Sequence, residues 1–194
     1  MLVSEFSHAM CSAGGCQISE RTGEAEMSEG KLPEPWLRGT WTEVNPVVRA
    51  VLHALELAEE DLWKWCHPLT LEQLNAASGR IAPVAFQLQH IARSLDRLLT
   101  YAEGGPLSEG QLAALKTELE PASSAKELFR ELAVALERSK ERLLALQAVD
   151  FAAPRAVGTK QLPTTVGGLV VHIADHTQRH AGQAITTAKI VTMR

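Results

Sequence analysis

The sequence predicts an all-α fold, a four-helix bundle with a disordered N-terminal tail. Apolar residues recur at alternating spacings of three and four over four long segments, as they do on the buried face of a helix. No segment keeps the period-two alternation of a half-buried strand. Residues 1–32 contain few apolar residues and no periodicity, which is typical of a disordered tail. We therefore expect a tail at 1–32 and one bundle domain at 33–194.

The bulk composition limits the classes of function. A formal net charge of −4 argues against a general nucleic-acid binder, which needs a basic surface to neutralise phosphates. No apolar run approaches the length of a membrane span, so we expect no membrane association. The N-terminus lacks a basic region followed by an apolar one, so a cytoplasmic location is the expectation.

The predicted tail holds two of the three cysteines, Cys11 and Cys16, with His8 nearby. Because no second ligand pair follows them, we interpret them as free thiols rather than as a metal site. Met27 is a candidate for an alternative start of the chain. The third cysteine, Cys66, is expected to be a small packed residue rather than a nucleophile.

The first two long helices are expected at about 44–66 and 83–103. Between them, Thr70 with Gln73 forms a capping box that starts a short helical turn. The run Gly-Gly-Pro directly after the second helix stops it, because glycine favours a helix end and proline cannot continue a helix.

A short helix is expected to start at Ser108, and the third long helix to cover about 124–148. In both, a serine cap is followed three residues later by Gln or Glu, as in a capping box. A loop that contains prolines and a glycine then leads to the last helix, at about 165–193. Within it, we interpret Gly182 as a point of close helix packing.

The last helix carries His172, His176 and His180 in the run VVHIADHTQRHAGQ. A helix turns about 100° per residue, so side chains four residues apart lie on one strip of its surface. The apolar seam of this helix, continued from Ile173, passes through His176 and His180 and leaves His172 on its flank. Neutral imidazole is the commonest ligand of transition metals, and one shared ion would satisfy two polar rings on a buried face. The strip therefore predicts a metal site.

A third ligand must come from another helix, and His90 is the best candidate because it lies beside the seam position Ile91. His53 falls opposite the seam of the first helix, so we expect it to be solvated. His67 lies in a loop, and the third long helix has no histidine. The predicted metal ligands are His90, His176 and His180.

Other metal architectures fit the sequence poorly. The zinc-protease pattern needs Glu directly after the first histidine of its pair, whereas Ile173 and Thr177 stand there. Di-iron bundles need E-x-x-H on two helices, and the only such run is in the tail, from Glu5 to His8. We therefore expect a mononuclear three-histidine site with open positions for water or substrate, holding zinc, nickel or iron.

Several nearby side chains are candidates for supporting roles. Asp175 and Gln183 are candidates to orient the histidine rings, and His172 to line the pocket. Arg93 and Arg97 are candidates to hold the carboxylate of an anionic thiol. For each of them, a solvated or ion-paired side chain is the simpler alternative.

The segments APVAFQLQHIARSLDRLL and LVVHIADHTQRHAGQ resemble the DinB-like (YfiT-like) family of four-helix bundles. In that family, one histidine of the second helix and two of the last helix, in H-x-x-x-H-x-G-Q, bind a divalent metal. Carried over, these positions are His90, His176 and His180. The resemblance covers about residues 36–193. Arg179 and Ala181 flank the last ligand where the family often has Tyr and Arg, so the trailing Arg of the family is absent here.

The resemblance also implies an activity, because the family includes thiol-dependent S-transferases and a maleylpyruvate isomerase that uses a low-molecular-weight thiol. We expect a metal-dependent reaction in which a small thiol attacks an electrophilic substrate. Two alternatives stay open: a non-catalytic metal-binding or stress-response module, and a hydrolase that uses metal-bound water. Family members often form homodimers, and Trp36 and Trp41 are candidates for such a contact.

Overall fold

The computed structural model of the chain describes residues 32–193. The predictions made for the tail fall almost wholly on residues 1–31 and so lie outside the described residues. They concern the disorder of the tail, the free thiols of Cys11 and Cys16, and the start at Met27.

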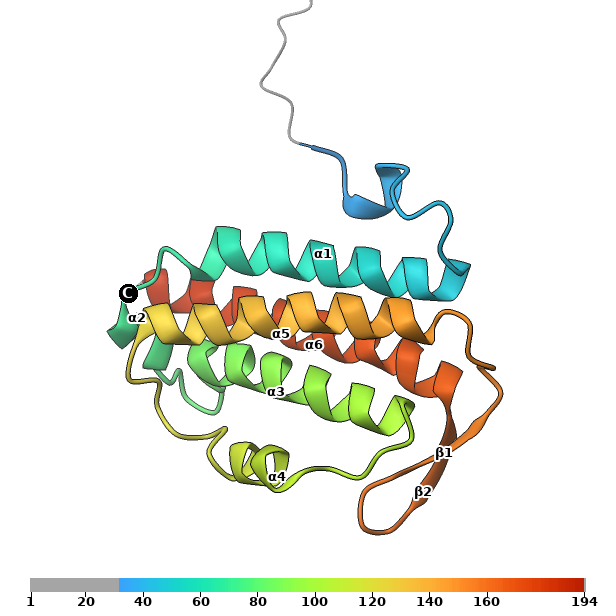
Figure 1. Cartoon of the computed structure of the whole chain (residues 1–194). Coiled ribbons are helices and arrows are strands. Elements are labelled where there is room, and N and C mark those ends of the chain that lie inside the picture. Colours follow the sequence, from blue (N-terminus) through green and yellow to red (C-terminus); the bar gives the residue numbers. More distant parts are fainter. Residues whose placement is uncertain (1–31, 194) are drawn as a thin grey trace, which may run out of the picture. The chain divides into compact units, whose positions relative to one another are not determined.

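Four long helices form a bundle, and the predicted all-α fold is confirmed (Figure 1). The helices are α1 (Pro46–Cys66), α3 (Val84–Ala102), α5 (Ala125–Leu146) and α6 (Val166–Thr192). Helix α6 packs against both α1 and α3, and α5 packs against α3 and α1. The helices therefore form a cycle in the order α1, α6, α3, α5, and α3 and α6 are direct neighbours along their lengths.

Large apolar side chains, most of them leucines, from all four long helices fill the centre of the bundle. The largest fully buried side chains include Leu52, Leu55, Leu62, Leu88, Ile91, Leu95, Leu99, Leu132, Leu136, Leu143 and Ile173. The seams expected for the first three long helices are buried almost throughout. The exceptions are Leu98, which is half-buried, and Trp65, which is 38% exposed and whose place in the core is taken by the neighbouring Cys66.

Short helices lie before α1, between α1 and α3, and between α3 and α5. They are the 3-10 helix η1 (Pro35–Leu37), α2 (Leu71–Asn75) and α4 (Glu109–Lys116). Both predicted capping boxes form, that of Thr70 with Gln73 at α2 and that of Ser108 with Gln111 at α4. The serine before α5 also caps its helix.

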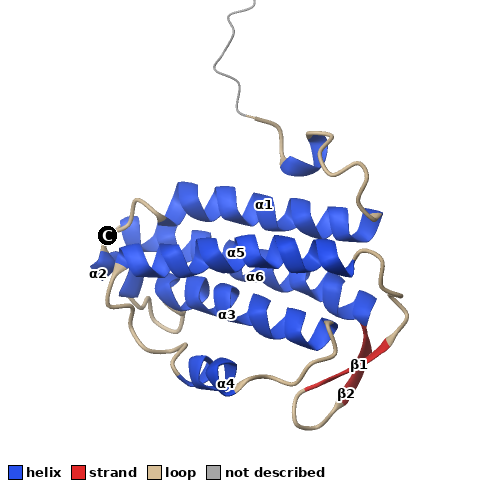
Figure 2. Ribbon diagram, viewed as in Figure 1, coloured by secondary structure: helices blue, strands red, loops and turns tan. Residues whose placement is uncertain are grey.

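The segment before the last helix, which was predicted to be a loop, forms a β-hairpin (Figure 2). Strand β1 (Pro154–Val157) pairs antiparallel with β2 (Leu162–Thr165), directly before α6. Each strand has four residues, and a proline lies in each, so neither carries a readable alternation. Arg155 donates from Nε to the carbonyl of Ala102, which fastens the hairpin to the end of α3.

The buried face of α6 differs in phase from the predicted seam. After Ile173 the buried residues are Thr177, Ala181, Ala184, Thr187, Ala188 and Val191, and the two histidines are not among them. His176 and His180 are half-buried beside this face. The prediction assumed a strict alternation of three and four residues, whereas a straight helix drifts away from that repeat. The histidines consequently lie at the edge of the core.

Within residues 32–193, no helix combines the length and the apolar character needed to cross a membrane.

Candidate metal centre

Three histidines from two neighbouring helices meet at one point. His90 is on α3, and His176 and His180 are one turn apart on α6. One ring nitrogen from each lies within 4.8 Å of the others, and all three side chains are half-buried. These are the three histidines predicted from the sequence, and the packing of α3 on α6 brings them together.

We call His90, His176 and His180 the triad. The ring of His90 contacts two side chains outside the triad, Glu118 and Phe86. Its Nδ1 lies 2.8 Å from Oε2 of Glu118, and its face stacks on Phe86, with 5.4 Å between the ring centres. Because a carboxylate oxygen accepts hydrogen bonds, Nδ1 of neutral His90 carries the proton and donates it. The remaining nitrogen, Nε2, then has a free lone pair.

The hydrogen bond of His180 has the same direction as that of His90. Its Nδ1 lies 2.7 Å from Oε1 of Gln87, one helical turn before His90. An amide oxygen accepts hydrogen bonds, so Nδ1 is again the donor and Nε2 again keeps its lone pair.

His176 follows the same pattern through a hydroxyl group. Its Nδ1 lies 3.4 Å from Oγ of Ser94, and that hydroxyl donates its own proton to the carbonyl of Ile91 at 3.1 Å. The oxygen of Ser94 is therefore left to accept from His176. Each of the three Nδ1 atoms thus faces a group that can accept its proton, and with the proton on Nδ1 the nitrogen Nε2 keeps its lone pair.

Two of these unprotonated nitrogens face one another at short range. Nε2 of His90 and Nε2 of His176 lie 3.2 Å apart. Two lone pairs at this distance repel each other unless a cation or an added proton lies between them. Two nitrogens bound to one zinc-like ion at about 2.0–2.1 Å, with an angle of about 90–110°, are about 2.9–3.4 Å apart. The observed distance therefore suits a shared metal ion.

The charge state of the α6 histidines suits a metal as well. Burial lowers the pKa of His176 to about 4, with His180, His90, His172 and Arg179 adding smaller effects in the same direction. Burial also lowers the pKa of His180 to about 4, and His90 and Arg179 again act in this direction. Both rings are therefore neutral at pH 7, which is the form that binds metal.

The predicted supporting residues on α6 do not contact the triad. Asp175 is exposed and pairs with Arg179 at 2.7 Å, and Gln183 is exposed. The prediction that these two orient the rings is wrong, because the buried face of α6 is turned away from its expected phase. His172 is exposed, but its ring centre lies 5.4 Å from that of His176, so it does border the site.

The side chains that do orient the rings were not predicted. Gln87 and Ser94 stand three residues before and four residues after His90, on the same face of α3, so helical spacing alone could have found them. Glu118 follows α4 and is 28 residues away from His90, with no local signal that links the two.

Two further histidines in the described part of the chain, His53 and His67, pack against other parts of the protein, away from the triad. His53 is buried, and its Nε2 lies 3.0 Å from Oγ1 of Thr40, so the prediction that it is solvated is wrong. The segment before α1 covers it, which the phase of α1 alone could not show. His67 stacks on Trp63 and lies edge-on to Phe129.

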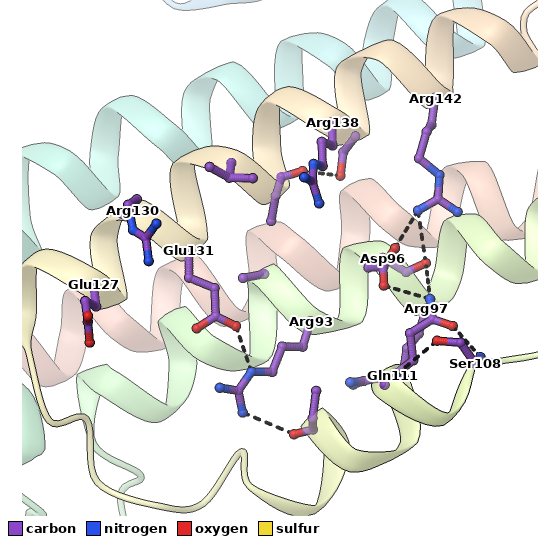
Figure 3. Close-up of a pocket in the computed structure, with 16 residues that line it drawn as sticks. Arg93, Asp96, Arg97, Ser108, Gln111, Glu127, Arg130, Glu131, Arg138 and Arg142 are labelled. Carbon is purple, nitrogen blue, oxygen red and sulfur yellow. Dashed lines mark hydrogen bonds and ion pairs between the residues drawn. The ribbon is translucent and has the colours of Figure 1, made fainter.

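The two arginines proposed for substrate binding are engaged by the protein. Arg93 lines a groove of about 720 Å³ between α3, α4 and α5, where it pairs with Glu131 and donates to the carbonyl of Ala114 (Figure 3). Arg97 pairs with Glu118. Neither guanidinium is therefore free to hold the carboxylate of a thiol. Cys66 is buried, and burial raises the pKa of its thiol to about 12, which agrees with a packed residue.

These features define a class of protein, a four-helix bundle with a three-histidine cluster between two adjacent helices. A family model of the DinB superfamily matches residues 54–184, which is more than half of the chain and includes all three histidines. The chain belongs to the DinB superfamily. A comparison with curated proteins found no significant match.

Proposed function

We propose that this protein binds a divalent transition metal through Nε2 of His90, His176 and His180. The observation that carries the proposal is the direction of the hydrogen bonds around the rings. All three Nδ1 atoms face acceptors, which leaves the Nε2 lone pairs for a metal, and one ring nitrogen of each histidine lies within 4.8 Å of the others. Three neutral imidazoles suit zinc, nickel and iron.

A small thiol is the substrate class that the donor set favours. Three neutral ligands leave the double charge of the ion uncompensated, so an anionic ligand at an open position is stabilised. Within residues 32–193, Glu118 is the one acidic side chain hydrogen-bonded to the triad, and it is committed to His90 and Arg97. No carboxylate there is placed to take a proton from water, whereas a thiol loses its proton readily.

We therefore propose metal-assisted thiol transfer as the activity. A bound divalent metal would lower the pKa of a coordinated thiol, whose proton passes to solvent. The sulfur forms a bond to an electrophilic carbon, and the leaving group departs with the electron pair of the broken bond. The neighbouring histidines hold the metal and contribute no proton.

Metal content tests the site. The wild-type protein and the His176→Ala and His180→Ala variants are loaded with zinc, passed over a desalting column and analysed for metal. His172→Ala is the matched control, because it removes an exposed histidine one turn away on the same helix. We expect about one zinc per chain in the wild type and the control, and strong loss in the other two. Unchanged zinc in His176→Ala and His180→Ala would refute the site.

A thiol screen tests the activity. Zinc-loaded and metal-free protein are incubated with a panel of cellular thiols and monochlorobimane, an electrophile with a chloride leaving group. We expect turnover with at least one thiol in the loaded protein alone. Equal rates with and without metal for every thiol would contradict the activity and leave a non-catalytic metal-binding module.

A further inference from the structure

A buried carboxylate outside the triad contacts one of its rings. The side chain of Glu118 is 5% exposed and lies in the segment between α4 and α5. Its Oε2 accepts from Nδ1 of His90 at 2.8 Å, and its Oε1 accepts from Arg97, whose side chain is 11% exposed. Both oxygens of the carboxylate are thus used, one on the triad and one on a permanent cation.

We propose that Glu118 is a positioning residue of the metal site, and that the ion pair with Arg97 holds its carboxylate in place. This inference rests on the metal site proposed above. The carboxylate holds the proton of His90 on Nδ1, so that Nε2 points at the metal without a proton. A negative acceptor at Nδ1 also makes Nε2 a stronger donor to the metal than a neutral acceptor would.

A purely structural role for the pair is the competing explanation, and the structure limits it. Fastening α4 to the bundle does not depend on Glu118, because Arg93 already bridges α3 to this region. It pairs with Glu131 of α5 (Figure 3), and it donates to the carbonyl of Ala114 and to Oγ1 of Thr117. A buried ion pair is moreover weak evidence for stability, because desolvation of the charges offsets their attraction.

The experiment compares zinc affinity, measured by competition with a chromophoric chelator. Glu118→Gln keeps the size of the side chain and removes its charge. Glu120→Gln makes the same chemical change two residues away at an exposed position and is the matched control. We expect Glu118→Gln to bind zinc about 10- to 100-fold more weakly than the wild type. The control should stay within about twofold, as surface substitutions usually do.

A second variant guards against a trivial loss of folding. Glu118→Gln leaves the buried guanidinium of Arg97 without a negative charge to pair with, and an unpaired buried charge by itself destabilises a protein. The double variant Arg97→Gln/Glu118→Gln removes both charges and should show the same loss of affinity. Nitrogen-15 NMR of the metal-free proteins reports the tautomer of His90. We expect a proton on Nδ1 in the wild type and a mixture of tautomers in the double variant.

Two results would overturn the inference. One is zinc affinity within about twofold of the wild type in both Glu118 variants, while His176→Ala has lost zinc. The other is weakened affinity with an unchanged tautomer of His90 in the double variant. If His176→Ala itself binds zinc as the wild type does, the proposed metal site is wrong, rather than the role of Glu118 alone.

Discussion

Each histidine of the triad has a different acceptor at Nδ1, and this sets the chemistry of the site residue by residue. His180 faces an amide, His176 a hydroxyl and His90 a carboxylate. Only the last acceptor is an acidic side chain, so the three rings would not be equivalent as ligands of the proposed metal. His90 is the ring whose donor strength the protein controls through another residue.

The lowered pKa values of the α6 histidines predict how the metal-free protein responds to acid. His176 and His180 change from an ordinary pKa of 6.5 to about 4 on folding. Between these values the unfolded chain binds more protons than the folded one, so stability falls as the pH falls. The full contribution is present above about pH 6.5, and it is lost progressively toward about pH 4.

Urea unfolding of chelator-treated protein at a series of pH values measures this effect. Because His176→Ala removes one of the two titrating rings, its unfolding free energy should fall less steeply between about pH 6.5 and about pH 4 than that of the wild type. His67→Ala, which removes an exposed histidine outside the three-histidine cluster, serves as the control. A slope in His176→Ala equal to that of the wild type would show that the folded protein does not hold this ring neutral.

At the scale of elements, α6 determines whether the site exists. After Ile173 its buried residues are mostly small, namely Thr177, Ala181, Ala184, Thr187 and Ala188, followed by Val191. Small side chains let α6 approach α1 and α3 closely, and they place the two histidines at the seam with α3. Ala181, which stands where the family often has Arg, is only 2% exposed, so this position serves packing here.

Gly182 gives a prediction for the same helix. The sequence indicated close packing at this position, but Gly182 is exposed and an added Cβ would meet no atom within 4 Å. Glycine inside a helix costs up to about 1 kcal/mol relative to alanine, so Gly182→Ala should raise the free energy of unfolding by about 0.5–1 kcal/mol.

Gly167→Ala is the control in α6. Its added Cβ would lie 3.1 Å from the carbonyl oxygen of Phe151, so the free energy of unfolding should rise less than in Gly182→Ala. Urea denaturation measures both variants. Destabilisation by Gly182→Ala would contradict the open environment of this position and indicate a contact with a second molecule.

At the scale of elements, features that depend on residues close together in the sequence were predicted correctly, and features that depend on distant residues were not. Helices and caps depend on neighbours within four residues, so the capping boxes at Thr70 and Ser108 were predicted correctly. The hairpin before α6 has strands too short to show a pattern, and it was missed. The face of α6 that is buried depends on which neighbouring helices it packs against. The predicted seam therefore passed through His176 and His180, which are only half-buried.

At the scale of the molecule, the site joins segments that are far apart in the chain. His90 and His176 are separated by 86 positions, and Glu118 comes from between them. The two-helix arrangement of histidines was predictable because each helix carries its own signal and the family resemblance joins them. Glu118 has no such signal, because its place beside His90 depends on how the segment after α4 folds back onto α3.

The central claim is that Nε2 of His90, His176 and His180 share one metal ion. Anomalous diffraction from crystals of the zinc-loaded protein tests it most directly. The account predicts one peak at about 2.0–2.2 Å from Nε2 of each of the three histidines, with every Nδ1 turned toward its protein acceptor. A peak elsewhere in the bundle, coordination through Nδ1 of any of the three, or no peak in zinc-saturated crystals would contradict the account.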